Sequence, residues 1–236
     1  YTGGEKKPSI YLYKADKKEA TSILSTINPS YILTTDRLTY FVSEDKKGEV
    51  VTLDKQYGPI FVTETNGSDP CHLSMDDQYR YLVVTNYTSG SFIVLLLDTK
   101  GVPNKGKFFV QHEGKGENPD RQAGPHCHSS CFSEDNNVLF VADLGTDILY
   151  YYDISEKSIE VVKENCVKIP NSGPRTVCRG KKGDKTLLLS CELDNTIRIM
   201  SYADGPLNCM AAYKVSSNPK NYPSEIAYCN DEVYFA

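Results

Sequence analysis

The stretch from Gly116 to Asp147 reads GENPDRQAGPHCHSSCFSEDNNVLFVADLGTD and decides how the whole chain is interpreted. Its first half places Arg121, His126 and His128 within eight positions. Its second half contains an apolar run of strand length, Val138 to Ala142, followed by a polar turn. The first half therefore has the character of a site, and the second half has the character of scaffold.

The scaffold half recurs along the chain. Copies begin at the prolines in positions 29, 70, 125, 174 and 223, so their spacings are 41, 55, 49 and 49 residues. Each of the first four copies predicts three strands joined by tight polar turns, because Asn and Asp readily adopt the left-handed conformations that hairpins need. In the third copy the predicted strands are His126–Phe132, Val138–Ala142 and Ile148–Asp153. A fourth strand fits between copies, for example at Lys107–Gln111 or Ser158–Val162.

Four strands per unit at a period of roughly 40 to 50 residues predict an all-β fold, a β-propeller of four-stranded blades. We expect residues 1–236 to form a single domain of this kind. A β-sandwich would also show short strands, but not the same turn chemistry at the same phase four times. The first strand of each propeller blade lines the central channel. The polar residues after each blade-opening proline are therefore predicted to face the channel: His72, His126, His128, Arg175 and Glu225.

Composition excludes several classes of protein. The net charge is −5, with Lys and Glu scattered, so the chain carries no nucleic-acid footprint. No apolar run approaches the roughly 18 residues of a membrane span. The eight cysteines are spread singly without a CxxC pair, which predicts buried free thiols instead of a disulfide framework. No third ligand has a spacing that matches the histidine pair, so no metal is expected.

Five stretches are similar, in the same order, to the seven-bladed lactonase family. This family includes the propeller-type 6-phosphogluconolactonases and the 3-carboxy-cis,cis-muconate lactonizing enzyme. Besides the opening stretch they are YTGGEKKPSIYLY (1–13), DPCHLSMDDQYRYLVVTNYTSGS (69–91), SGPRTV with LSCELDNTI (172–177, 189–197) and YPSEIAYCNDEVYFA (222–236). The combination of RQxxPHxH with ADLGTD is the specific part of the resemblance.

The resemblance implies a seven-bladed ring, of which about five blades are represented here. The single domain is therefore expected to be incomplete at its C-terminus, and an arginine of the family's site would lie beyond Ala236. One position departs from the family pattern: the fourth copy has Gly-Pro-Arg-Thr, where relatives often have Gly-Pro-Arg-His. The place after Arg175 thus lacks an imidazole.

The resemblance also implies the function. It predicts a cytoplasmic, cofactor-independent lactonase that hydrolyses 6-phosphogluconolactone, an anionic sugar lactone, to 6-phosphogluconate in the pentose phosphate pathway. The implied catalytic residues are His128 as general base or acid, Arg175 as a grip for an anion or oxyanion, and Glu192 as proton acceptor or water-positioning carboxylate. Two alternatives stay open: a cycloisomerase that closes a lactone with the same groups, and a propeller that binds partners without catalysis.

Four further residues are predicted to contact substrate: Arg121, His126, His72 and Glu225. For each of these residues the alternative is a purely structural role in contacts between blades. Three other polar positions are assigned to scaffold. Cys127 and Cys131 are predicted to pack inside a blade, and Asp143 is predicted to cap backbone N–H groups of its turn.

Overall fold

The protein is described by a computed structural model that covers residues 9–154, 159–161, 166–203, 206–218 and 221–236. All of the regular structure in these ranges is β-strand, and no helix in them is long and apolar enough to cross a membrane. The first strands are β1 Ser9–Lys14, β2 Glu19–Ser25, β3 Ile32–Thr34, β4 Thr39–Ser43, β5 Glu49–Leu53, β6 Pro59–Glu64, β7 Pro70–Met75, β8 Tyr81–Asn86, β9 Ser91–Leu97 and β10 Pro103–Gln111. The remaining strands are β11 Cys127–Phe132, β12 Val138–Asp143, β13 Ile148–Ile154, β14 Ile159–Val161, β15 Val167–Lys168, β16 Pro174–Arg179, β17 Thr186–Cys191, β18 Thr196–Ser201, β19 Asn208–Lys214, β20 Ile226–Cys229 and β21 Glu232–Phe235.

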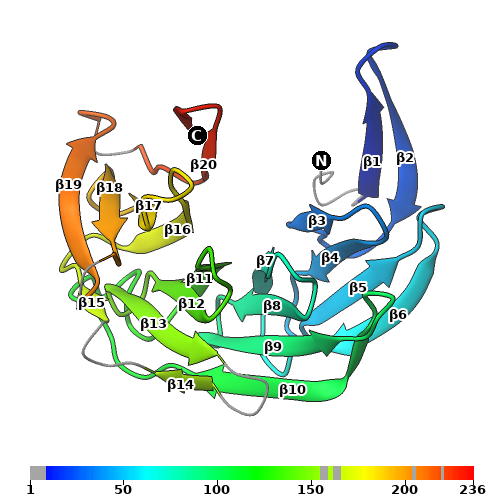
Figure 1. The fold of residues 1–236 in the computed structure, drawn as a ribbon, viewed down its shortest axis with the longest axis horizontal. Helices are drawn as coiled ribbons and strands as arrows, with labels where there is room; N and C mark the ends of the chain where they lie inside the picture. The colour runs from blue at the N-terminus through cyan, green and yellow to red at the C-terminus, as the bar shows by residue number, and fades with distance from the viewer. Residues whose placement is uncertain (1–8, 155–158, 162–165, 204–205, 219–220) are drawn as a thin grey trace.

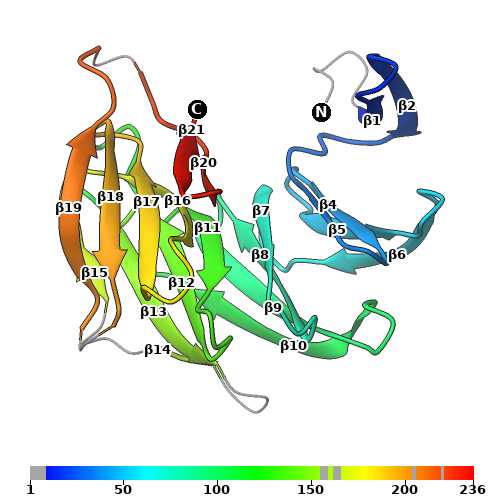
Figure 2. The ribbon, with the colours of Figure 1, turned by 45° about the horizontal axis from the view of Figure 1, so that its top comes forward.

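The strands form antiparallel meanders, and four of these are complete blades. Blade 1 is β3–β6, blade 2 is β7–β10, blade 3 is β11–β14 with β15 also paired to β13, and blade 4 is β16–β19. Figure 1 shows them in an arc with the first strand of each blade on the inside, and the β1–β2 and β20–β21 hairpins lie at its two ends. Figure 2 shows the four strands of blade 4 side by side. The predicted propeller of four-stranded blades is confirmed.

The predicted strands and turns of blade 3 are nearly those observed. β12 and β13 begin where the sequence placed them, but β11 begins at Cys127, so His126 precedes the strand. The turns use left-handed residues as expected, with φ of 60° at Asn136 and 61° at Asp147. β10 contains the expected strand Lys107–Gln111, while Ser158 and Val162, the ends of the other expected strand, lie outside the described residues.

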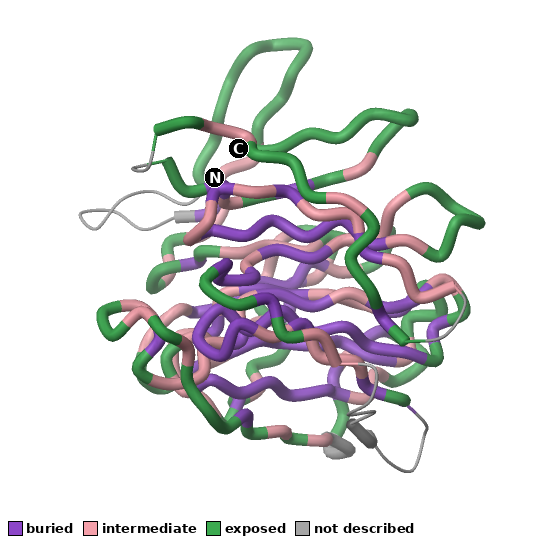
Figure 3. The backbone as a smooth tube through the Cα atoms, turned by 90° about the vertical axis from the view of Figure 1, so that its left-hand side faces the viewer, coloured by how far each residue is buried: buried purple, intermediate pink, exposed green. Residues whose placement is uncertain are grey.

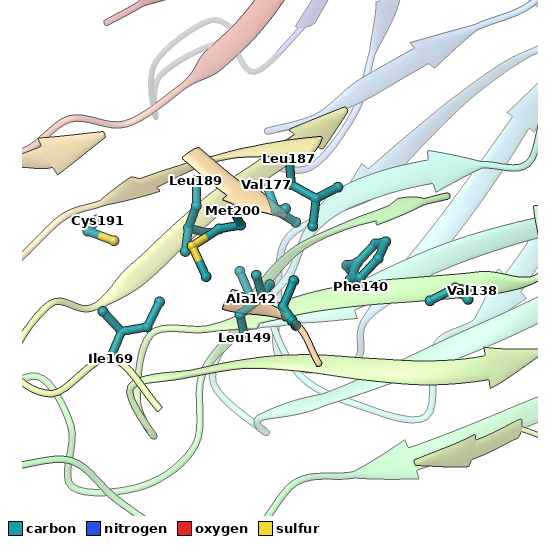
Figure 4. Close-up of a cluster of buried hydrophobic side chains, with 11 residues drawn as sticks. Val138, Phe140, Ala142, Leu149, Ile169, Val177, Leu187, Leu189, Cys191 and Met200 are labelled. Carbon is teal, nitrogen blue, oxygen red and sulfur yellow. The ribbon is translucent and has the colours of Figure 1, made fainter. Parts of the chain in front are cut away.

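The core lies between blades, not within one sheet. Alternate residues of a middle strand pack on opposite neighbours: Leu139 and Val141 face blade 2, while Val138 and Phe140 face blade 4. Figure 4 shows the cluster between blades 3 and 4, in which Phe140 and Leu187 lie among the labelled side chains. Because both faces of the middle strands are covered, β8 and β12 are buried along their whole length. Figure 3 shows exposed residues concentrated at the outer strands and loops.

Neighbouring blades are joined at the inner strands by small polar side chains. The hydroxyls of Ser74 on β7 and Ser130 on β11 are 2.6 Å apart. The backbone N–H of Val177 on β16 donates to Ser129 Oγ at 2.8 Å. The Thr85 hydroxyl of blade 2 donates to the carbonyl oxygen of His128 at 3.1 Å. These bonds fix the positions of the inner strands relative to one another, and with them any side chains that face the channel.

Candidate active site

A cavity of about 470 Å³ lies where the first strands of the blades converge. Five of the predicted site residues line it: His72, Arg121, His128, Arg175 and Glu225. The other lining residues are Ser30, Tyr31, Glu44, Cys71, Tyr87, Thr176 and Ser224. Strands β7, β11 and β16 each contribute a basic side chain directly after the start of the strand, which is the arrangement that the repeat phase predicted.

Two arginines of the cavity share one buried carboxylate. Arg121 Nη2 lies 2.5 Å from Glu192 Oε1, and Arg175 Nη1 pairs with Glu192 Oε2. Glu192 follows β17, is 4% exposed and is not among the residues that line the cavity. Both of its oxygens therefore accept from guanidinium groups, which orients the two arginines toward the same space. Its predicted role as a proton acceptor stays a prediction.

The two lining histidines are neutral at physiological pH. Burial lowers the pKa of His72 to about 3. Burial, the guanidinium of Arg175 and the neighbouring His72 hold the pKa of His128 well below its usual range. A neutral imidazole can accept a proton, whereas a charged one cannot, but the lowered pKa also makes His128 a weaker base than a free imidazole.

Three buried polar atoms of this site have no hydrogen-bond partner among the described residues. They are Nδ1 of His72, Nδ1 of His128 and Nε of Arg175. A buried polar group without a partner costs roughly 1–3 kcal/mol. The three atoms are themselves shielded from solvent, so they are desolvated polar groups next to the cavity, with Arg175 able only to donate and each imidazole able to accept.

His126 occupies a different environment from His128. Its ring stacks on Tyr87, with centroids 4.4 Å apart and planes 9° apart, and its Nδ1 lies 2.9 Å from the carbonyl oxygen of Tyr87. It is not among the residues that line the cavity. A bulge between Cys127 and Ser129 in the pairing of β11 with β12 interrupts the alternation that would place the two histidines on one face. The predicted contact of His126 with substrate stays a prediction.

A fully buried network supports the start of β11 from behind. Asp143 Oδ1 accepts from the backbone N–H groups of His126, Gly145 and Thr146 at 2.8, 2.9 and 3.1 Å. Its other oxygen lies 2.6 Å from His112 Nδ1, and His112 Nε2 lies 2.6 Å from the Tyr152 hydroxyl. The capping role predicted for Asp143 is confirmed.

His112, Asp143 and Cys127 together could be taken for metal ligands, because their ligand atoms lie within 4.8 Å of one another. Ligands of a tetrahedral ion with bonds of about 2.0 Å would stand about 3.3 Å apart. The 2.6 Å between His112 Nδ1 and Asp143 Oδ2 is instead a hydrogen-bond distance. The geometry is therefore that of a closed hydrogen-bond network.

Glu225 lies directly before β20 and borders two cavities. The second, of about 680 Å³, continues from the first and shares with it Tyr31, His72, Thr176 and Glu225. Burial raises the pKa of Glu225, and the charge of Arg175 opposes that rise. The hydroxyl of Thr176, at the position without the family's imidazole, donates to the carbonyl oxygen of Ser224 at 2.6 Å, so it serves as a link to the segment before β20.

The whole described sequence matches one family model. The model is that of the lactonase, 7-bladed β-propeller family, and the match covers residues 1–236. The chain belongs to this lactonase family. Among curated relatives, it is 30% identical over 215 residues to a 6-phosphogluconolactonase of Bacillus subtilis, covering 86% of this chain and 60% of the relative. It is 25% identical over 202 residues to a 6-phosphogluconolactonase of Formosa agariphila, covering 84% of this chain and 55% of the relative.

Solved structures agree with this lactonase family assignment. A Bacteroides fragilis protein, crystallised as a candidate 6-phosphogluconolactonase, superposes with a TM-score of 0.83 at 25% identity over 99% of this chain and 71% of that one. The periplasmic gluconolactonase of Pseudomonas aeruginosa has a TM-score of 0.79 at 21% identity over 94% of this chain and 69% of that one, a likeness of fold. The chain spans about 60% of the length of the Bacillus relative.

Tyr87 is one of the cavity-lining residues to which the sequence patterns assign no role. It lies in the turn after β8 and is at once beside His126, His128 and the cavity. In the strand pairing Asn86, Asp143 and Cys191 are equivalent, so Tyr87, Leu144 and Glu192 occupy the same place directly after the second strand of blades 2, 3 and 4. Two of these three places, Tyr87 and Glu192, carry a polar group.

Proposed function

We propose that this site hydrolyses sugar lactones, and that its substrate is 6-phosphogluconolactone. The observation that carries the proposal is the convergence of Arg121, His128 and Arg175 on one cavity, with both arginines held by the buried carboxylate of Glu192. The names of the Bacillus and Formosa relatives support the phosphorylated sugar as the substrate.

The chemistry follows from the state of each group. Neutral His128 accepts a proton from water as the water oxygen bonds to the lactone carbonyl carbon. The carbonyl oxygen becomes an oxyanion, and the N–H groups of Arg175 stabilise it by donating hydrogen bonds. The ring C–O bond then breaks, and the protonated imidazole returns its proton to the leaving ring oxygen. The net reaction adds one water to one ester and yields a hydroxy acid.

Glu192 acts in this scheme by holding Arg121 and Arg175. Two guanidiniums on one carboxylate leave one positive charge in excess at that point, which suits an oxyanion or a carboxylate product. Glu44 and Glu225 also line the cavity, so with Glu192 three carboxylates stand against the two guanidiniums and the site has no excess of positive charge. Recognition of a phosphate therefore rests on placed donors and not on a general positive field.

The test is hydrolysis above the spontaneous rate, measured by acid release at constant pH. The substrates are 6-phosphogluconolactone, unphosphorylated gluconolactone and 3-carboxymuconate, the last in the cyclising direction. We expect turnover of the phosphorylated lactone with a higher kcat/KM than that of gluconolactone. Hydrolysis of neither lactone would refute the proposal, and equal turnover of both would refute the phosphosugar as the preferred substrate.

Variants assign the roles. His128→Ala should lower kcat by about 10²–10⁴, and Arg175→Lys should lower it by roughly 10–10³ because a point charge replaces a planar donor. The matched control is Arg37→Lys. Arg37 lies at an exposed turn, and its guanidinium donates to the carbonyl oxygen of Thr99. Glu192→Gln should raise KM more than it lowers kcat. A loss confined to kcat would instead assign Glu192 the proton-accepting role.

A further inference from the structure

We propose that Tyr87 is a positioning residue that holds Arg121 through its hydroxyl and His128 through its ring. This inference rests on the proposed lactone hydrolysis for its kinetic consequence, and its structural part can be measured without turnover.

The position of Tyr87 is fixed by its own backbone. Its N–H donates to the carbonyl oxygen of Asp69 at 2.9 Å, directly after β8 ends. Leu144 and Glu192 make the corresponding bonds in blades 3 and 4, to His126 and Gly173. The turn is therefore built the same way in three blades, and the aromatic ring is not needed to form it.

The ring of Tyr87 instead contacts the histidines of the next blade. One face stacks on His126, and His128 lies at 5.6 Å with its plane turned by 80°, an edge-to-face contact. Stacked and edge-to-face pairs of rings attract each other beyond the burial of area, so they favour particular ring orientations. The unpartnered Nδ1 of His128 shows that no hydrogen bond among the described residues fixes that end of the imidazole. Its orientation therefore depends on contacts with its ring, of which Tyr87 provides one.

Tyr87 and Arg121 line the same cavity. Burial opposes the charge of Arg121, but its interactions with the Tyr87 hydroxyl and with Glu192 raise the pKa of Arg121 overall. Arg121 lies in the segment before β11, outside any strand, and its guanidinium is held at one end by Glu192. A second interaction from a different blade restricts the long side chain, which reduces the ordering cost when it receives an anionic group. Tyr87 is also absent from the apolar clusters formed by the described residues, so its ring is placed for the site and not for the core.

Two substitutions separate the hydroxyl from the ring. Tyr87→Phe keeps the ring and removes the interaction with Arg121, so KM for the phosphorylated lactone should rise about tenfold while kcat stays within about twofold. Tyr87→Leu, which copies the leucine of blade 3, also removes the ring and should lower kcat by a further factor of about ten. Tyr213→Phe, on the exposed outer strand β19, is the control for loss of a hydroxyl.

The readout that needs no activity is the NMR spectrum of the imidazoles. The chain has only four histidines, so each ring can be assigned by substitution. The Phe variant should keep the ring-current shifts of His126 and His128, and the Leu variant should lose both while its urea midpoint shows that it is folded. Unchanged imidazole shifts in the Leu variant would overturn the proposal whether or not lactones are hydrolysed. A Phe variant that loses kcat with KM unaltered would also overturn it, because the hydroxyl would then act on the reaction itself.

Discussion

Substitution of Asp143 tests whether the buried hydrogen-bond network behind β11 depends on the acceptor oxygens of this side chain. In the wild-type protein the fully buried carboxylate of Asp143 accepts three backbone N–H bonds through one oxygen and contacts His112 through the other. Asp143→Ala leaves these donors without a partner at a site of 0% exposure. At roughly 1–3 kcal/mol for each buried unsatisfied group, and with partial relief by entering water, the loss should be about 4–8 kcal/mol. That is a large part of the roughly 5–15 kcal/mol that stabilises a domain.

Asp143→Asn should be far milder. The amide oxygen can accept the same three backbone bonds, and the amide N–H can donate to His112 Nδ1 if the imidazole carries its proton on Nε2 and donates to Tyr152. Only the charge assistance is lost, so we expect a cost of about 1–3 kcal/mol. The ratio between the two variants therefore measures acceptor geometry separately from charge.

The assay is urea unfolding at 25 °C, followed by far-UV circular dichroism and tyrosine fluorescence, since the chain has 17 Tyr and no Trp. Asp153→Ala is the matched control, because Asp153 lies on β13 of the same sheet and is exposed. Equal losses for the Ala and Asn variants would refute the reasoning, as would a loss for Asp143→Ala no larger than that of the control.

Two further predictions concern titration and thiol chemistry. Burial lowers the pKa of His72 to about 3, whereas the pKa in the unfolded chain is about 6.5. Below about pH 6.5 the unfolded chain therefore binds a proton that the folded chain does not, and the free energy of unfolding decreases as the pH decreases. His72→Phe should therefore remove about 2 kcal/mol of the stability lost between pH 7 and pH 5, as measured by urea titrations at each pH, and an unchanged pH slope would contradict this. Exposed Cys209 and Cys229 should react with a thiol reagent in the native protein. Cys127 and Cys191 should react only on unfolding, because they are fully buried and burial raises the pKa of their thiols. Mass spectrometry of the labelled peptides distinguishes the two groups.

The thiol prediction also corrects one expectation from the sequence. The eight cysteines are free, as expected, but only Cys127 and Cys191 are fully buried, and Cys209 and Cys229 are exposed. β19 and the β20–β21 hairpin, which carry the two exposed thiols, are mostly exposed in this structure. Burial of a single cysteine depends on what covers its strand, and strand pattern alone does not contain that information.

The parts of the fold that follow from local chemistry were predictable. Prolines at the start of copies, Asn and Asp at left-handed turns, and apolar runs of strand length locate the blades, and the phase of each copy places His72, His128 and Arg175 at the channel. The same reasoning could not separate His126 from His128. Two residues spaced two apart lie on the same face of a strand only where the strand pairing is regular. The bulge between Cys127 and Ser129 makes the pairing irregular at this point.

The partners of the arginines were also beyond the sequence. Glu192 is 71 positions from Arg121 and 17 from Arg175, and the resemblance suggested that these residues act together without saying how they meet. The geometry shows one carboxylate held by both guanidiniums. Tyr87 was overlooked for the same reason, since stacking across blades leaves no periodic signal in either blade.

The hydroxyl residues that join the inner strands set a dimension of the molecule. Blades are wedges that come closest at their first strands, and there the contacts are made by Ser74, Ser129 and Ser130, all of them small. The width of these side chains, compared with the bulky rings and branched chains farther out, determines the angle between successive sheets. Larger residues at these serines would push the first strands of neighbouring blades apart and widen the channel mouth. The curvature of the arc, and the number of blades that a closed ring can hold, therefore depend on the small side chains nearest the axis.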